Sequence, residues 1–212
     1  MRIISTNIGK PTTFSWNGKN VTTGIFKMPV TEAIHLGKEE VKGDEISDRK
    51  VHGGEFKACY LFSADHYPYW KNLYPELEWT YGMLGENLTV EGLNEKKLII
   101  GDIYNIGNAL IQITQPREPC FKFAAKFKSP DVLKQFIEHG YPGTYVRVLE
   151  EGTVKNGDQF ILHKKAANSI SIWDFFQLLF TENKNKDHIR LIENNTALPK
   201  QKRDKLKSYL NT

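Results

Sequence analysis

Cysteine is scarce in this 212-residue chain, which has only Cys59 and Cys120. Two thiols cannot build the disulfide framework of a small secreted domain, and they are too few for an iron–sulfur cluster with four Cys ligands. We therefore expect a reducing, cytoplasmic setting. Because a sequence does not place two Cβ atoms, it leaves open whether these thiols form a disulfide.

Long hydrophobic runs are also missing. No stretch of about 18 apolar residues occurs, which excludes a membrane-spanning helix. The first five residues, Met-Arg-Ile-Ile-Ser, lack the apolar centre of a signal peptide. The apolar share of 40%, with four Trp, nine Tyr and twelve Phe, is nevertheless enough for a sizeable core. These bounds fit one large domain, or one domain with a small appendage.

Several catalytic patterns are absent as well. The sequence contains no Ser-His-Asp order, no glycine-rich phosphate loop and no His-x-x-x-His pair, so it disfavours the chemistries that those patterns serve. Four of the six histidines show no mutual spacing that indicates a metal site. We expect ordinary polar or surface positions for His66, His139, His163 and His188.

Positive charge is modest overall and gathers at one end. The formal net charge is +4, and from Thr181 onward there are eight Lys or Arg against four Asp or Glu, so this tail carries the whole excess. A basic tail can contact nucleic acid or an acidic protein, but runs of charge are usually solvated faces. We therefore do not expect nucleic acid as a partner.

The first 165 residues or so contain short strands separated by turns, the pattern of a β-rich domain. Asn17-Gly18 and Gly107-Asn108 are strong signals, because such pairs favour two-residue hairpin turns. The second hairpin leads directly into the segment around Cys120. A helix is expected after Ser129-Pro130-Asp131, with Gly140 as its end.

The sequence then changes to a helical pattern. Ser171 opens a capping-box-like start for a helix over 172–180, and two further helices are expected over 187–192 and 199–210. Three short helices bury little surface alone, so they should pack on the β-rich part or on a partner. The predicted organisation is a mainly β, α+β fold, with one domain over residues 1–165 and a three-helix extension over residues 166–212.

The segment 115–122, Gln-Pro-Arg-Glu-Pro-Cys-Phe-Lys, holds the most reactive pattern in the chain. Its Pro-x-x-Pro step predicts a stiff, extended segment and not a helix. Arg117 and Lys122 flank Cys120, and nearby positive charge favours a thiolate. Such a cysteine suits a soft metal or an anionic ligand, although a buried, inert thiol would give the same sequence.

Two other stretches carry candidate ligand-binding residues. His52-Gly53-Gly54 lets the backbone approach a ligand and leaves N–H groups for an anion, with Asp48 and Lys57 on either side. A tight glycine turn with incidental charges is the alternative interpretation. Asn87 offers both a donor and an acceptor to a ligand, or else it holds a turn.

Together these stretches resemble the MOSC domain family, which is named after the C-terminal domain of molybdenum cofactor sulfurase. The resemblance covers about residues 2–163, and its motifs are far more specific together than alone. In chain order they are Asp48-Arg-Lys-Val-His52-Gly-Gly with Lys57-Ala58, His66-Tyr-x-x-Trp70, Gly85-Glu-Asn87-Leu, Gly101-Asp102-Ile and Gln115-Pro-Arg117-x-Pro-Cys120-x-Lys122. Glu55-Phe56 departs from the Pro-Asp that the family commonly has, which leaves the shape of the turn before Lys57 open. The tail is similar to the three-helix extension of the family's bacterial YiiM-type branch.

The resemblance implies a β-barrel-like domain that binds the molybdenum cofactor, molybdopterin. Cys120 stands at the position of the family's molybdenum ligand, and a thiolate suits such a soft, redox-active metal. By position, Arg117 and Lys122 would face the pterin phosphate or the molybdenum oxo groups. The same pocket would be lined by Asp48, His52, Lys57 and Asn87.

The resemblance also implies a reaction. YiiM-type proteins are implicated in reducing N-hydroxylated compounds such as N-hydroxylated purines, amidoximes and hydroxylamines, so the expected activity is a two-electron reduction at molybdenum. Because no flavin, haem or iron–sulfur motif is present, a separate flavin or iron–sulfur reductase would supply the electrons. The alternatives are a non-catalytic cofactor carrier and a sulfur carrier with a persulfide on Cys120.

Overall fold

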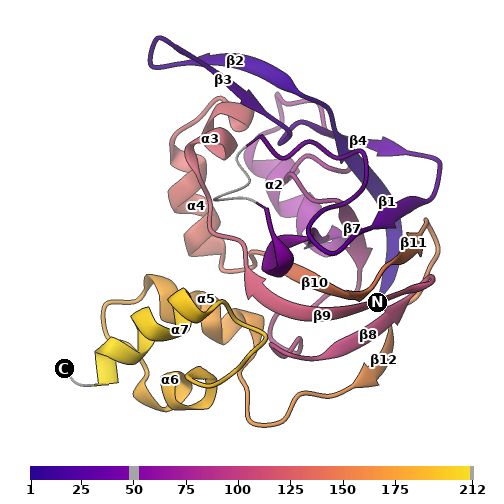
Figure 1. Cartoon of the computed structure of the whole chain (residues 1–212). Helices are drawn as coiled ribbons and strands as arrows, with labels where there is room; N and C mark the ends of the chain where they lie inside the picture. The colour runs from indigo at the N-terminus through magenta and orange to yellow at the C-terminus, as the bar shows by residue number, and fades with distance from the viewer. Residues whose placement is uncertain (48–52, 211–212) are drawn as a thin grey trace.

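The structure is a computed structural model that describes residues 1–47 and 53–210. Its main element is an eight-stranded sheet, in which every neighbouring pair is antiparallel except β6 and β7 (Figure 1). In sheet order the strands are β12 (Ile161–Lys164), β8 (Ile103–Ile106), β9 (Ala109–Pro116), β10 (Thr144–Glu150), β6 (Cys59–Ser63), β7 (Leu88–Glu91), β1 (Arg2–Gly9) and β4 (Lys27–Val30). A large sheet with several short helices confirms the predicted fold class.

The sheet curves, but over the described residues it does not close into a barrel (Figure 1). Its edge strands are β12 and β4. The start of β1 nevertheless bonds to the segment before β12, because the Ile3 amide donates to the Asp158 carbonyl at 2.9 Å and an isolated bridge joins Arg2 to Gln159. The described strand pairings thus show a curved sheet whose two ends come close to each other, and they do not show a closed barrel.

Both predicted hairpins are present. β2 (Thr12–Trp16) and β3 (Lys19–Thr23) form a separate two-stranded sheet that projects from the main sheet (Figure 1). Their turn residues, Asn17 and Gly18, have φ angles of 48° and 74°, the conformation that a type I′ turn needs and that Asn and Gly tolerate. A further small sheet, β5 (Ile34–Leu36) with β11 (Gly152–Val154), is not predicted by the sequence.

The first part of the chain also contains short helices, which pack around an aromatic core. They are α2 (Tyr67–Leu73), α3 (Phe121–Phe127) and α4 (Asp131–His139), with 3-10 turns η1 (Glu55–Lys57) and η2 (Ala64–His66). α4 ends, as predicted, at Gly140 with a φ of 76°. The fully buried aromatic side chains of this core include Phe62, Trp70, Phe123, Phe127, Phe136 and Phe176.

The three C-terminal helices are also present: α5 (Ile172–Phe180), α6 (Lys186–Ile192) and α7 (Lys200–Lys207), the last followed by the 3-10 turn η3 (Ser208–Leu210). Ser171 forms the predicted capping box, since its Oγ accepts the Asp174 amide hydrogen at 3.0 Å. Buried side chains of these helices share one hydrophobic cluster with Ile111 and Val146 of the main sheet. The tail therefore packs on the sheet, and a domain boundary near residue 165 stays a prediction. Within the described ranges, no helix has the length and hydropathy to span a membrane.

Candidate functional site

Five of the residues that the sequence indicates gather in one pocket. Lys57, Asn87, Arg117, Cys120 and Lys122 all line it, although they are spread over more than sixty positions of the chain. The other two predicted ligands, Asp48 and His52, lie outside the described residues. The remaining walls come from the segments 23–27 and 44–47 and from Ala58, Tyr60, Gly85 and Tyr145.

Cys120 lies at the junction between a strand and a helix. β9 ends at Pro116, and α3 begins directly after Cys120, whose carbonyl accepts the amide hydrogen of Phe123 at 2.9 Å. The side chain is a free, partly exposed thiol on the pocket wall. The Pro-x-x-Pro step is non-helical, as predicted, but helix α3, whose first turn contains Lys122, is not among the predicted helices.

Helix α3 begins so early because the two prolines restrict only their own backbone and that of the residue before each of them. Beyond Cys120, the side chains of Phe123, Ala124 and Phe127 are all buried. Their spacing is that of a helix with one apolar face. This spacing is the signal in the sequence that indicates α3.

Arg117 is a buried cation on the pocket wall, and only 5% of its surface is exposed. Its Nη1 donates to the Leu84 carbonyl, and its guanidinium lies 5.0 Å from the Tyr60 ring centroid and 4.8 Å from that of Phe123. It forms no ion pair with any described carboxylate. Gly85 permits this position, because a Cβ there would lie 3.1 Å from Nη1. A buried guanidinium without a carboxylate partner is suited to an anionic ligand.

Lys57 and Lys122 bring two further cations to the pocket. The turn that carries Lys57 is tied to β9, because Thr114 Oγ1 donates to the Phe56 carbonyl at 2.8 Å. Burial lowers the pKa of Lys57 and the Lys202 ammonium lowers it further, whereas Glu118 and Cys120 raise it. Lys122 is 8% exposed, and no described residue accepts a hydrogen bond from its ammonium or forms an ion pair with it. A cation on the pocket wall without a partner among the described residues also favours an anionic ligand.

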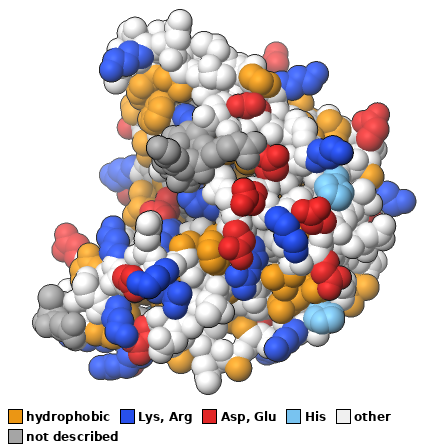
Figure 2. Space-filling view, in the orientation of Figure 1, with side chains coloured by type: hydrophobic (Ala, Val, Ile, Leu, Met, Phe, Trp, Pro, Cys, Tyr) orange, Lys and Arg blue, Asp and Glu red, His pale blue; other side chains and the backbone are white. Residues whose placement is uncertain are grey.

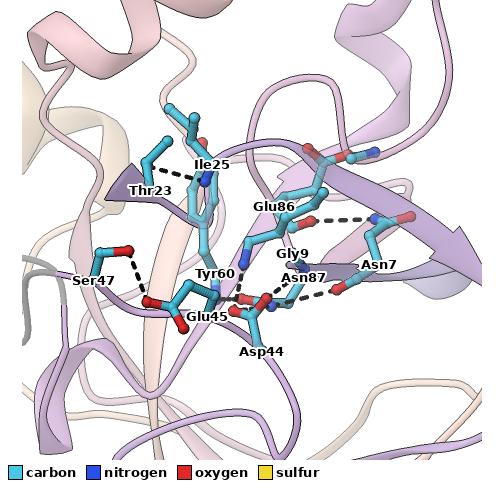
Figure 3. Close-up of polar contacts among 12 residues, drawn as sticks. Asn7, Gly9, Thr23, Ile25, Asp44, Glu45, Ser47, Tyr60, Glu86 and Asn87 are labelled. Atoms are coloured by element: carbon cyan, nitrogen blue, oxygen red, sulfur yellow. Dashed lines mark hydrogen bonds and ion pairs between the residues drawn. The ribbon is translucent and has the colours of Figure 1, made fainter. Parts of the chain in front are cut away.

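A buried network supports the opposite wall, and the sequence does not indicate it (Figure 3). Asp44 Oδ2 accepts from the Lys27 ammonium and, at 2.9 Å, from the Asn87 amide group. Its Oδ1 accepts the Gly9 amide hydrogen at 2.6 Å. Asp44 and Lys27 are 17 residues apart and in no motif, so only the folded chain brings them together. The network fixes the segment 44–47 against β1 and β4.

Asn87 is part of this network and is largely occupied within the protein. Its amide nitrogen donates to Asp44 and, at 3.4 Å, to the Asn7 carbonyl, while its Oδ1 accepts the Tyr60 amide hydrogen at 3.2 Å. Both N–H groups are therefore used, and one lone pair of Oδ1 is left for a ligand. The structure supports the turn-holding interpretation of Asn87, and its contact with a cofactor stays a prediction.

The second cysteine, Cys59, is a core residue of β6. It is fully buried, and burial raises the pKa of its thiol far above the usual range. Such a thiol is inert in the folded protein. In the part of the chain that the structure describes, no three His, Cys, Asp or Glu side chains gather so as to hold a metal ion.

Known proteins resemble this chain over nearly its whole length. Residues 48–160 match the family model of the MOSC domain. The uncharacterized protein YflK of Bacillus subtilis is 37% identical over 196 residues, which cover 92% of this chain and 88% of YflK. The crystal structure of YiiM from Geobacillus stearothermophilus superposes with a TM-score of 0.81 at 34% identity, and the match covers 98% of this chain and 97% of YiiM.

One relative is much longer. A protein of Gibberella moniliformis named Reductase is 31% identical over 185 residues, which cover 86% of this chain but only 32% of that protein. Most of the Gibberella protein thus lies outside the region that this chain resembles.

Proposed function

The chain belongs to the MOSC domain family, and from this premise we propose that it binds the molybdenum cofactor around Cys120 and reduces N-hydroxylated compounds. One observation carries the proposal: the pocket joins a partly exposed thiol to the cations of Lys57, Arg117 and Lys122. Thiolate is a suitable ligand for a soft metal, and the cations suit the negative charge of a pterin phosphate.

The described residues fit this cofactor. The Lys122 ammonium and the Arg117 guanidinium have no carboxylate partner among them, so each can pair with an anionic group that enters the pocket. Cys120 would hold the metal, and Arg117 and Lys122 would bind the phosphate or oxo groups. Lys57 would line the same pocket. When bound, the cofactor supplies two-electron redox chemistry at the metal.

The reduction of an N–OH group to N–H consumes two electrons and two protons and releases one water. The protons must come from the pocket or its solvent, and the lowered pKa of Lys57 suits it to exchange a proton there. The electrons must come from outside, because two cysteines cannot ligate a four-Cys cluster. We infer a separate flavin or iron–sulfur reductase as the donor.

Metal analysis tests the binding step. The wild-type chain and the Cys120→Ala variant are expressed in a host that makes molybdenum cofactor, and the molybdenum and pterin of each purified protein are measured. We expect about one molybdenum per chain in the wild type and nearly none in Cys120→Ala. Cys59→Ala is the matched control, because Cys59 is buried away from solvent and should leave the metal content unchanged. Equal molybdenum in wild type and Cys120→Ala would overturn the ligand assignment.

Turnover then separates an enzyme from the two alternatives. Molybdenum-loaded protein is mixed with a chemical electron donor and an amidoxime or hydroxylamine, and the amidine or amine product is measured. Metal-loaded protein without turnover would favour a cofactor carrier. An added sulfur on Cys120 in the mass spectrum would favour a persulfide sulfur carrier, for which a partly exposed thiol is also suited.

A further inference from the structure

The C-terminal helix α7 reaches the segment that carries Cys120. Lys202 Nζ donates to Glu118 Oε1 at 2.5 Å, and Glu118 stands two residues before Cys120. We propose that Lys202 is a positioning residue of the pocket, which holds the Cys120 segment in place through Glu118. The importance of Lys202 for cofactor binding rests on the proposed function. The contact between Lys202 and Glu118, and the test of it, do not depend on that function.

Two other lysines of α7 form ion pairs within the tail. Lys200 bonds to Asp204 at 2.6 Å on the same helix, and Lys207 lies 3.3 Å from Glu193. Figure 2 shows Lys and Arg side chains gathered over the C-terminal helices at the lower left, with acidic side chains among them. Of the ion pairs that α7 forms with described residues, only that of Lys202 leaves the tail. This pair therefore differs from the surface pairs around it.

Glu118 is the point at which the Cys120 segment can be held. The segment runs from Arg117, which is buried and bonded to the Leu84 carbonyl, to Cys120 at the start of α3. Between them, Pro119 has no amide hydrogen to donate. The Glu118 side chain is 48% exposed and has no hydrogen-bond or ion-pair partner among the described residues except Lys202. Loss of Lys202 would thus leave the exposed part of the segment without a side-chain anchor.

Lys202 is itself well fixed. Its side chain is 22% exposed, and its Nζ lies 5.9 Å from the ring centroid of Phe175, a fully buried residue of α5. The helix is anchored by Leu206, which is buried in the hydrophobic cluster that the tail shares with the main sheet. The Lys202 charge also acts inside the pocket, since it lowers the pKa of Lys57. A fixed cation on a fixed helix is what a positioning role requires.

Thiol chemistry on the cofactor-free 212-residue chain tests the inference. The alkylation rate of Cys120 by iodoacetamide is measured at one pH by mass spectrometry, for wild type, Lys202→Met, Lys202→Arg and Glu118→Gln. We expect Lys202→Met and Glu118→Gln each to change the rate by about threefold or more, and Lys202→Arg to restore it. Lys200→Met is the matched control, because it removes the same charge from the same helix. Cys59 reports unfolding, because it is buried and reacts only if the chain opens.

A double-mutant cycle separates positioning from a general effect of charge. If Lys202 acts through Glu118, Lys202→Met should have no further effect in a Glu118→Gln background. The inference is wrong if Lys202→Met behaves like Lys200→Met, or if its effect persists in full without the Glu118 carboxylate. Lys202→Met could unfold the chain, and Cys59 would then react. In that case Lys202→Arg and Glu118→Gln still test the inference, because Arg keeps the positive charge and Glu118 is 48% exposed. This assay needs neither metal nor turnover. The positioning role of Lys202 can therefore be confirmed even if the proposed function is wrong, and it can be wrong even if the proposed function is confirmed.

Discussion

At the scale of single residues, Lys126 holds two pocket loops together at a cost in stability. This α3 residue is 8% exposed, and its ammonium donates to the Ile25 carbonyl at 2.9 Å and to the Gly82 carbonyl at 2.8 Å. Burial lowers its pKa to about 7, well below the 10.5 of a free lysine. Between these two values the unfolded chain binds more protons than the folded one, so the free energy of unfolding should rise with pH across this window.

The Lys126→Met variant lacks this titration and isolates its effect. Between pH 7 and pH 9, the wild type should gain about 2 kcal/mol of unfolding free energy relative to Lys126→Met. Urea unfolding of both proteins at the two pH values measures the difference, and other titrating groups cancel in the comparison. An equal pH dependence in both proteins would contradict the low pKa of Lys126.

The sequence predicted the pocket residues that belong to a motif. It did not predict those that only the folded chain brings together. Arg117, Cys120 and Lys122 lie within six positions, so their proximity follows from the chain itself. Lys27 and Asp44 meet only because β4 and the segment 44–47 come together at β1. The same reason applies to the histidines that the sequence treats as ordinary: His66 Nδ1 lies 3.2 Å from His139 Nε2, across 73 positions.

At the scale of elements, the loop before β7 depends on Gly85. Its φ of 84° is unfavourable for any residue with a Cβ, and that Cβ would lie 3.1 Å from both Arg117 Nη1 and Ile25 Cγ1. Gly85→Ala should therefore cost about 1–3 kcal/mol of stability and displace the Arg117 guanidinium. We expect it to lower the molybdenum content of protein from a cofactor-competent host.

Gly92→Ala is the control for backbone strain. Gly92 has a similar φ of 71°, but nothing lies within 4 Å of its would-be Cβ. Both variants should lose stability in urea unfolding, whereas only Gly85→Ala should also lose molybdenum. If Gly92→Ala lost as much metal as Gly85→Ala, the effect would come from stability and not from the contact with Arg117.

Elements with local signals were predictable, and those that depend on distant pairing were not. The hairpin at Asn17-Gly18 and the capped start of α5 each follow from a few adjacent residues. β5 and β11 are each three residues long, and they pair with each other across more than a hundred positions. No local pattern distinguishes such strands from loops.

At the scale of the whole molecule, the tail and the sheet share one core. Leu206 of α7 is 4% exposed, and it belongs to the same cluster as Ile111 of β9 and Cys59 of β6. The sequence predicted three tail helices that pack on the β-rich part or on a partner, because composition shows where helices begin but does not choose between these two surfaces. A shared core predicts that tail and sheet unfold together.

The Leu206→Ala variant tests this cooperativity with Cys59 as a reporter in the sheet. Removing a buried leucine should cost about 2–5 kcal/mol, so under rapid opening and closing the labelling of Cys59 by a thiol reagent should accelerate roughly 30-fold or more. Leu191→Ala is the matched control, since Leu191 lies on α6 in the same tail but is 43% exposed and should change the rate little. If Leu206→Ala loosened the tail while Cys59 labelling stayed at the wild-type rate, the three helices would be an independent unit.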